Sequence, residues 1–266
     1  MAIAPPQYGY RCRTAARLSL AVAAGFALAS QAIHAAELND TGQTTCYRDG
    51  QTSTCAGGQD GRFGRDAAAM AAALPKTGAG AGGFDFTKIA NDGSDLPDGA
   101  LLGSGPGQWA CTRDNVTGLT WEVKTPAASD LRYSGHLYTW YSTAAANGGN
   151  AGSVGSNSCN GTLGGAFSNQ CNTSNYRIAV NGTVLCGYSN WRLPTPEELL
   201  SVVNFAIGNP AIDTGYFPNT PAFFFWTGTN LAPDPNRAWG IYFNNGNLGY
   251  LDKSGGHSVR LVRGAP

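Results

Sequence analysis

Apolar and polar residues alternate along several short segments of this chain, and each of these segments predicts a β-strand. Two of them lie at 108–112 and 119–123, and the turn residues between them favour a hairpin. The last third of the chain adds four more strand segments, at 222–227, 238–243, 248–251 and 258–262. Between the middle two, Asn245-Gly246 indicates a two-residue type I′ turn, because both central residues of that turn need positive φ.

Helical patterns are fewer and shorter. The alanine-rich stretch 67–73 favours a short helix by propensity, and residues 172–181 form a second candidate. A third helix is expected over 196–205. Thr195 is placed to accept a hydrogen bond from the amide of Glu198, and Glu198 to accept one from the amide of Thr195. This is a capping box, with a proline at the first helical position, where its missing N–H costs nothing.

The chain begins with the pattern of a secretory signal peptide. Arg11, Arg13 and Arg17 precede an uncharged apolar run over 18–29, and small residues follow. The run is too short for a membrane-spanning helix, although an uncleaved anchor stays open as an alternative. We therefore expect a signal peptide at 1–36 and no membrane span after its removal. The predicted location is the periplasm, the cell surface or the medium.

Two regions follow the signal peptide. Residues 37–106 form a leader with a small cysteine loop and a glycine-rich linker at 78–83, and residues 107–266 form the main domain. We expect the leader to pack partly on the main domain and not to build a core of its own.

The charge balance argues against a polyanion partner. The chain has 17 basic and 17 acidic residues; without the first 36 residues, which hold three arginines and no acid, 14 basic and 17 acidic residues remain. The resulting net charge of −3 disfavours nucleic acid as a partner, although a local basic patch stays possible.

Six cysteines remain after the signal peptide, and an even number in an exported chain predicts disulfides. Six cysteines allow 15 pairings, and the sequence does not choose among them. Our preferred pairing closes two local loops, Cys46–Cys55 and Cys159–Cys171, and leaves Cys111–Cys186 to cross the domain. The spacing of cysteines and histidines does not suit zinc. We expect no metal site and no cofactor.

Two separated segments carry a family resemblance. The first is Asn190–Leu200, with Trp191, Arg192, Pro194, Thr195 and Glu198; the second is Val259–Arg263, with Arg260 and Arg263. Together they resemble the Lcl C-terminal domain family, a bacterial family of largely unassigned function. Further segments in a fitting order extend this resemblance over about 107–264. We expect these motif residues to be structural, with the arginines pairing with an acid such as Glu197 or Glu198 or stacking on a ring.

The Arg-Leu-Pro-Thr helix start and the closing strand are also distantly similar to the formylglycine-generating-enzyme group, which implies a C-type-lectin-like fold. The oxidase chemistry of that group needs a close cysteine pair near the end of the chain, and the last cysteine here is Cys186. The tripeptides through which C-type lectins bind sugar with calcium are also missing. The resemblance therefore implies a fold without implying either activity.

The candidate binding site lies at residues 236–257, where polar and aromatic residues are interleaved with apolar ones. In a two-faced hairpin, Ile241, Phe243, Leu248 and Leu251 are expected to pack inward, and tyrosine and asparagine side chains to face outward. A merely solvated hairpin is the competing interpretation. The predicted ligand-binding residues are Tyr242, Asn244, Asn245, Asn247, Tyr250, Asp252 and His257.

The sequence thus predicts an α+β protein with a C-type-lectin-like domain, short antiparallel strands, two or three short helices and long loops held by disulfides. The predicted function is non-catalytic recognition of a glycan or a protein surface, as in an adhesin, and relatives with such roles agree with this. The loop at 147–170 is a second possible part of the binding face. An enzyme acting on the cell envelope and a structural envelope protein without a soluble ligand are the alternatives.

Overall fold

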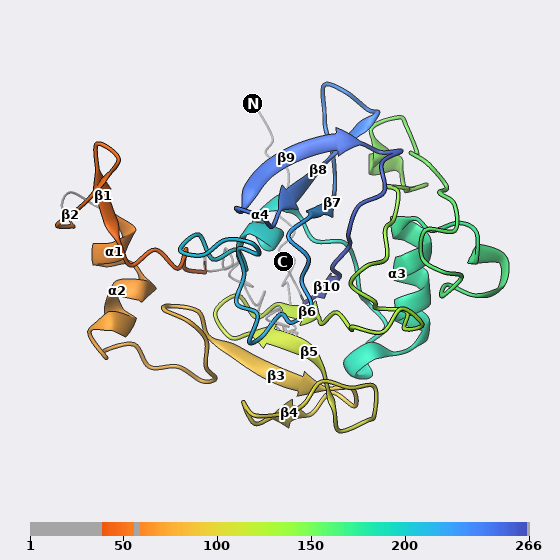
Figure 1. The fold of residues 1–266 in the computed structure, drawn as a ribbon. Coiled ribbons are helices and arrows are strands. Elements are labelled where there is room, and N and C mark those ends of the chain that lie inside the picture. The colour runs from red at the N-terminus through yellow and green to blue at the C-terminus, as the bar shows by residue number, and fades with distance from the viewer. Residues whose placement is uncertain (1–38, 56–58, 265–266) are drawn as a thin grey trace, which may run out of the picture. The chain divides into compact units, whose positions relative to one another are not determined.

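Two antiparallel sheets form the framework of the protein in a computed structural model that describes residues 39–55 and 59–264 (Figure 1). The strands are β1 Cys46–Arg48, β2 Gln51–Ser53, β3 Phe86–Ala90, β4 Asp95–Leu96, β5 Trp109–Asp114, β6 Thr120–Glu122, β7 Phe224–Asn230, β8 Arg237–Tyr242, β9 Asn247–Asp252 and β10 Val262–Arg263. The larger sheet has the order β10-β6-β5-β3-β4 and the smaller one β7-β8-β9, while β1 and β2 form a separate hairpin.

Short helices complete the fold. They are α1 Asp60–Phe63, α2 Arg65–Met70, α3 Thr173–Gly182 and α4 Pro196–Leu200, with 3₁₀ turns η1 Ala145–Asn147, η2 Gly165–Phe167 and η3 Leu185–Gly187. The predicted helices at 172–181 and at Pro196 are present, but α4 ends at Leu200 and not at 205. The mixed helix and sheet class, with strands predominating, is confirmed.

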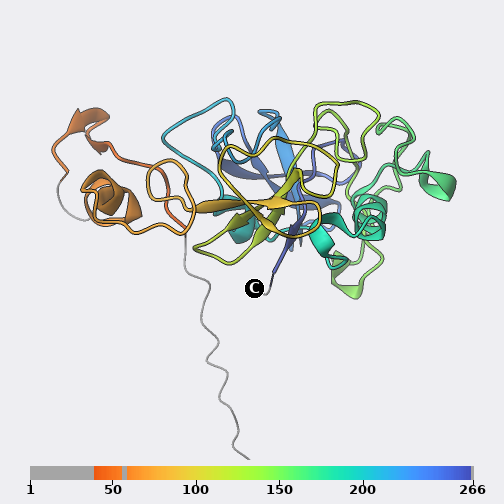
Figure 2. The same ribbon diagram turned by 90° about the horizontal axis from the view of Figure 1, so that it is seen from below.

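The strand β7 separates two hydrophobic clusters. Successive side chains of a strand point to opposite faces, so Phe225 and Trp226 enter different clusters. Phe225 joins Trp121 of β6 and Leu199 of α4 in a cluster with side chains from both sheets. Trp226 joins Tyr176 of α3 in the second cluster, on the other face. The two sheets therefore share one hydrophobic cluster. Figure 2 shows the fold from below.

All three predicted disulfides are confirmed. Cys46–Cys55 closes the loop around β1 and β2, Cys159–Cys171 closes the long loop before α3, and Cys111–Cys186 joins β5 to η3. The last bridge links residues 75 positions apart and lies in the core, with both cysteines fully buried.

The larger sheet continues across the predicted leader boundary at residue 107. β3 and β4 come from the leader, and β3 pairs with β5 from Phe86↔Asp114 to Ala90↔Trp109. All of the described residues fall in one compact unit. Among the described leader residues, β1, β2, α1 and α2 belong to neither of the two main sheets (orange in Figure 1).

The closing segment keeps its predicted alternation, but its strand is shorter than predicted. Val259 and Leu261 join the cluster that holds Trp226, whereas the guanidinium of Arg260 packs over the rings of Phe217 and Phe225 in the other cluster. The same guanidinium donates hydrogen bonds to the carbonyl oxygen of Glu122 and to Oγ1 of Thr220. The expected structural role of Arg260 beside a ring is therefore confirmed. The strand proper, β10, is limited to Val262–Arg263 and pairs with β6, so the predicted bounds of 258–262 were wrong.

Within the part of the chain that the structure describes, no helix combines the length and apolar character needed to cross a membrane. The predicted signal peptide at 1–36 lies outside that part.

Candidate ligand-binding site

A hollow of about 590 Å³ opens beside the edge strand β9 of the smaller sheet. Its lining is mostly apolar and aromatic. The lining residues are Leu137, Phe223, Phe224, Tyr242, Asn247, Leu248, Gly249, Tyr250, Leu251, Gly256 and His257. Most of the lining therefore comes from the hairpin region that the sequence indicated. The rest comes from Phe223 and Phe224, at the start of β7, and from the loop residue Leu137.

The ring of Phe224 lies across two glycines that face each other in the sheet. Gly240 of β8 pairs with Gly249 of β9. A Cβ atom on Gly240 would lie 2.3 Å from the Phe224 ring, whereas one on Gly249 would lie 3.7 Å from it. A side chain at 240 would thus push the ring away, and glycine at this position allows the ring to lie flat against the sheet.

His257 stands next to this ring. Its imidazole packs against Phe224 at 5.2 Å and against Trp226 at 4.9 Å between ring centroids. Its backbone is fixed by two hydrogen bonds with Tyr138. Burial lowers the pKa of His257 below its usual value, so the ring is neutral at neutral pH and presents one donor and one acceptor nitrogen.

The two tyrosines of the hairpin differ in their surroundings. Tyr242 pairs with Phe224 of β7 and lies on the same face of the sheet, where 41% of it is exposed. Tyr250 of the edge strand pairs with Trp239, and its side chain lies on the opposite face of the sheet from Phe224. There its ring packs edge-on against the ring of Trp239, so Tyr250 lines only the margin of the hollow. Tyr242 is therefore the tyrosine whose ring faces into the hollow.

The seven predicted ligand-binding residues divide into three groups. Tyr242, Asn247, Tyr250 and His257 line the hollow. Asn244 and Asn245 lie in the exposed turn and do not line it. Asp252 belongs to a separate depression of about 260 Å³ with residues of the 147–170 loop, and it accepts a hydrogen bond from Arg237.

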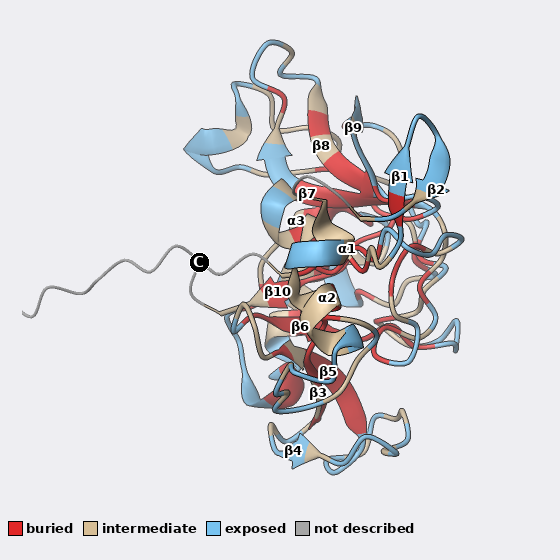
Figure 3. Ribbon diagram, turned by 90° about the vertical axis from the view of Figure 1, so that its left-hand side faces the viewer, coloured by how far each residue is buried: buried red, intermediate tan, exposed pale blue. Residues whose placement is uncertain are grey.

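Two apolar residues of β9 are placed differently from the prediction. Leu248 and Leu251 were expected to pack inward with Ile241 and Phe243, but 46% and 36% of them are exposed. β9 is an edge strand, and its residues are all exposed or half-buried (Figure 3). Within the described residues no other element covers β9, so alternate side chains along this strand do not differ consistently in burial.

The turn between β8 and β9 is also different from the predicted type I′ turn. The last pair of the hairpin is Tyr242↔Asn247, which leaves four residues in the turn. Gly246 has a φ of 80°, while Asn245 has no positive φ. The dipeptide did mark a hairpin, but only its glycine adopts the left-handed conformation.

Comparison with known proteins places the chain in a family. The model of the Lcl C-terminal domain matches residues 110–263, which is more than half of the chain. The chain belongs to the Lcl C-terminal domain family. No curated protein and no solved structure matches it.

The match includes every residue that lines the hollow, so the site lies within the Lcl C-terminal domain. β1 to β4 and the whole of the leader precede it, and β5 begins one residue earlier. The hollow is thus a feature of the family domain in this chain, while the leader adds two strands to one of its sheets.

The motif residues of the Lcl C-terminal domain hold two distant segments together. The predicted capping box is present: Thr195 and Glu198 exchange hydrogen bonds at the start of α4. Arg192 donates two hydrogen bonds to the carboxylate of Glu198, and its backbone pairs with Val262. The guanidinium of Arg263 stacks on Tyr188 at 3.5 Å.

Two further motif residues are held by backbone groups. Trp191 is buried, and its indole N–H donates a hydrogen bond to the carbonyl oxygen of Leu185. The carbonyl oxygen of Pro194 accepts a hydrogen bond from the amide of Gly228.

The sequence prediction missed Leu137, Phe223 and Phe224 as lining residues of the Lcl C-terminal domain hollow. A signal for two of them was present, because residues 223–226 are four consecutive aromatic residues. Successive side chains of a strand point to opposite faces of the sheet. Four consecutive aromatic residues can therefore all be buried only if both faces of the sheet are covered; otherwise at least one ring is exposed. Here Phe223 remains 59% exposed.

Proposed function

We propose that this chain is an exported, non-catalytic recognition protein that binds a glycan in the hollow of its Lcl C-terminal domain. The observation that carries the proposal is the aromatic lining of the hollow, where the exposed ring of Tyr242 lies beside the largely buried ring of Phe224. Binding sites for small ligands are typically concave and mostly apolar, with a few polar groups that fix orientation.

The chemistry of the lining favours a sugar. The C–H faces of a sugar ring are apolar and suit the face of an aromatic ring such as Tyr242, and its hydroxyl edges need hydrogen-bonding partners. Asn247 offers an amide with donors and an acceptor, and the neutral His257 offers one of each. A cluster of apolar rings with these two polar groups at its margin matches an amphipathic ligand better than a charged one.

Binding is a better fit than catalysis. Of the side chains that line the hollow, only His257 titrates near neutral pH. Its ring is packed between Phe224 and Trp226, with no carboxylate or nucleophile in the lining to form a catalytic pair.

Export is supported by two independent features. Three disulfides are typical of proteins that fold in an oxidising compartment. The first 36 residues have the pattern of a signal peptide. We further propose a C-type-lectin-like fold, supported by the pairing of Arg192, at the start of the helix motif, with Val262 in the closing strand.

A protein partner is the second candidate, and the edge strand β9 favours it. All six of its residues are exposed or half-buried, and its free edge could pair with an extended peptide. In that mode the exposed side chains of Leu248 and Leu251 would contact the partner.

A glycan array with the purified chain tests the first proposal, with Tyr242→Ala as the main variant. We expect Tyr242→Ala to lose at least tenfold in affinity for whichever glycan binds, and Tyr250→Ala to lose less, because the Tyr250 ring packs on Trp239. Tyr47→Ala is the matched control, since Tyr47 is an exposed tyrosine of the leader. Equal binding by Tyr242→Ala and wild type would refute the site, and the absence of any glycan binding would refute the ligand class.

A further inference from the structure

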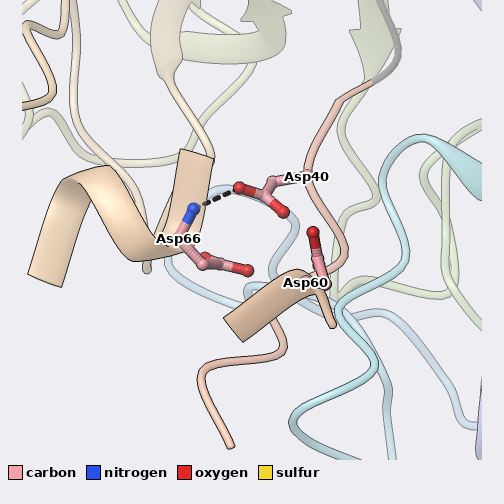
Figure 4. Close-up of side chains that lie close together, drawn as sticks. All are labelled: Asp40, Asp60 and Asp66. Carbon is pink, nitrogen blue, oxygen red and sulfur yellow. Dashed lines mark hydrogen bonds between the residues drawn. The ribbon is translucent and has the colours of Figure 1, made fainter. Parts of the chain in front are cut away.

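Three carboxyl groups meet in the leader, outside the Lcl C-terminal domain. Asp40 lies before β1, Asp60 is the first residue of α1 and Asp66 the second residue of α2. One oxygen of each lies within 4.8 Å of the others. Figure 4 shows the three side chains pointing toward one another.

Two of the three carboxylates are buried, Asp60 is half-buried, and none of them forms an ion pair within the described residues. Asp66 is fully buried and Asp40 is 7% exposed. No ion pair within residues 39–55 and 59–264 involves Asp40, Asp60 or Asp66. Like-charged carboxylates in a buried position repel one another, so the arrangement is unfavourable without a counter-charge.

The local hydrogen bonds leave one acceptor open. Thr41 donates to Asp40 through its amide and to Asp60 through its hydroxyl. The amide of Asp66 donates to Asp40, and Oδ1 of Asp66 accepts from the amide of Gly83. Oδ2 of Asp66 is buried and has no hydrogen-bond partner. A buried carboxylate oxygen without a partner is costly, which points to a missing ligand.

Glycines close the space around the carboxylates. A Cβ atom would lie 2.4 Å from Asp60 Oδ1 if built on Gly64, and 2.0 Å from Asp66 Oδ1 if built on Gly82. On Gly83 it would lie 2.2 Å from Asp40 Oδ2. The backbone at Gly64, Gly82 and Gly83 thus lies so close to the three carboxylates that a side chain at any of these positions would collide with one of them.

We propose that Asp40, Asp60 and Asp66 bind a divalent cation, and that this cation is calcium. Carboxylate oxygens are the ligands that hard cations prefer. Calcium takes six to eight oxygen ligands in a flexible geometry, whereas magnesium is usually held by one or two carboxylates together with water or phosphate. Three converging carboxylates therefore favour calcium, and water would supply the remaining ligands.

Burial, together with the neighbouring carboxylates of Asp66 and Asp60, raises the pKa of Asp40 to about 6. The three carboxylates are thus close enough to act on one another electrostatically.

The cation would take the place of an apolar core in this part of the leader. α1 has no buried residue, and the only buried residue of α2 is Asp66. The cation would join the chain before β1 to both helices, next to the segment with Gly82 and Gly83. Thr41 hydrogen-bonds through its carbonyl to Phe205 of the main domain, so the same ion would hold the leader against it.

Calorimetric titration of the metal-free chain with CaCl₂ tests the proposal. We expect one calcium per chain and weaker binding of MgCl₂. Asp66→Asn and Asp60→Asn should each lower calcium affinity at least tenfold. Asp49→Asn is the matched control, because Asp49 is an exposed aspartate of the same leader.

Thermal unfolding separates loss of the site from loss of the fold. Calcium should raise the unfolding temperature of the wild type and leave that of Asp66→Asn unchanged. In EDTA, Asp66→Asn should unfold at the same or a higher temperature than the wild type, since it removes a like charge. Absence of calcium binding to the wild type, or wild-type affinity in both Asp66→Asn and Asp60→Asn, would overturn the proposal. Tighter binding of magnesium would overturn the choice of ion.

Discussion

Lys124 and Glu122 form an ion pair that is shielded from solvent. Nζ of Lys124 lies 2.7 Å from Oε1 of Glu122, and their side chains are 3% and 0% exposed. The hydroxyl of Tyr176 donates to the same carboxylate, and the amide of Leu261 donates to its second oxygen. Arg260 donates to the carbonyl of Glu122. One buried acid therefore holds together β6, α3 and the closing segment.

Glu122→Gln should destabilise the protein by about 3–5 kcal/mol, because it leaves Lys124 as an uncompensated buried charge and removes a strong acceptor. Urea unfolding followed by tryptophan fluorescence measures the change. Glu197→Gln, at an exposed position, is the control and should stay within about 0.5 kcal/mol of the wild type. A similarly small effect for Glu122→Gln would show that the pair does not hold these elements together.

The same pair predicts a pH dependence of stability. Burial lowers the pKa of Lys124 to about 8, although the charge of Glu122 opposes the shift. Between about pH 8 and 10 the unfolded chain then binds more protons at this lysine than the folded one, so the contribution of Lys124 to stability rises with pH. Its size is on the order of 1 kcal/mol for each pH unit.

Urea unfolding at pH 7.5 and 9.5 measures this slope. In Lys124→Met the part of the slope that belongs to this lysine should disappear, so the difference between wild type and variant grows with pH. Burial also raises the pKa values of Tyr138 and Tyr176 well above 10, and these two act in the opposite direction only above pH 10. An identical slope in both proteins would contradict the assignment to Lys124.

The helix cap at α4 supports a third prediction. Oγ1 of Thr195 accepts from the amide of Glu198 at 3.2 Å. Thr195→Ala should cost about 1 kcal/mol of unfolding free energy, because the amide loses its partner. Thr195→Ser keeps the hydroxyl and should recover most of this loss. If serine and alanine variants were equally destabilised, packing of the threonine methyl group would be the cause.

The features that the sequence predicted correctly are mainly local. The capping box depends on two residues three positions apart. Two of the disulfides join cysteines nine and twelve positions apart, and once these are paired only two cysteines remain for the third disulfide. The strand segments followed from alternation over a few residues. The family was recognised from its motifs, and the family model agrees with it.

The features that were missed depend on contacts across the chain. The hydrogen-bond acceptors of Arg260 were not predicted, because neither Glu122 nor Thr220 is near it in the sequence. Leu248 and Leu251 are exposed because β9 is at the edge of its sheet, which alternation alone does not show. Asp40, Asp60 and Asp66 follow no metal-binding spacing, and only the fold brings them together.

The two facing glycines of the hollow provide a matched pair of variants. Gly240→Ala places a methyl group 2.3 Å from the Phe224 ring and 2.2 Å from the carbonyl oxygen of Phe225, while Gly249→Ala places one at an ordinary contact distance of 3.7 Å. Gly240→Ala should therefore cost about 1–3 kcal/mol in urea unfolding, as overpacking of a core does, and should displace Phe224 from the hollow. Gly249→Ala should change stability by less than about 0.5 kcal/mol.

The same pair tests whether the position of Phe224 matters for ligand binding. If the ring forms part of the binding surface, Gly240→Ala should weaken glycan binding under conditions in which circular dichroism shows the protein to be fully folded. Gly249→Ala changes the adjacent surface by one methyl group and should keep most of the affinity. Equal affinities in the two variants would mean that the ligand does not contact Phe224, and the site would then have to lie on the outer part of β9.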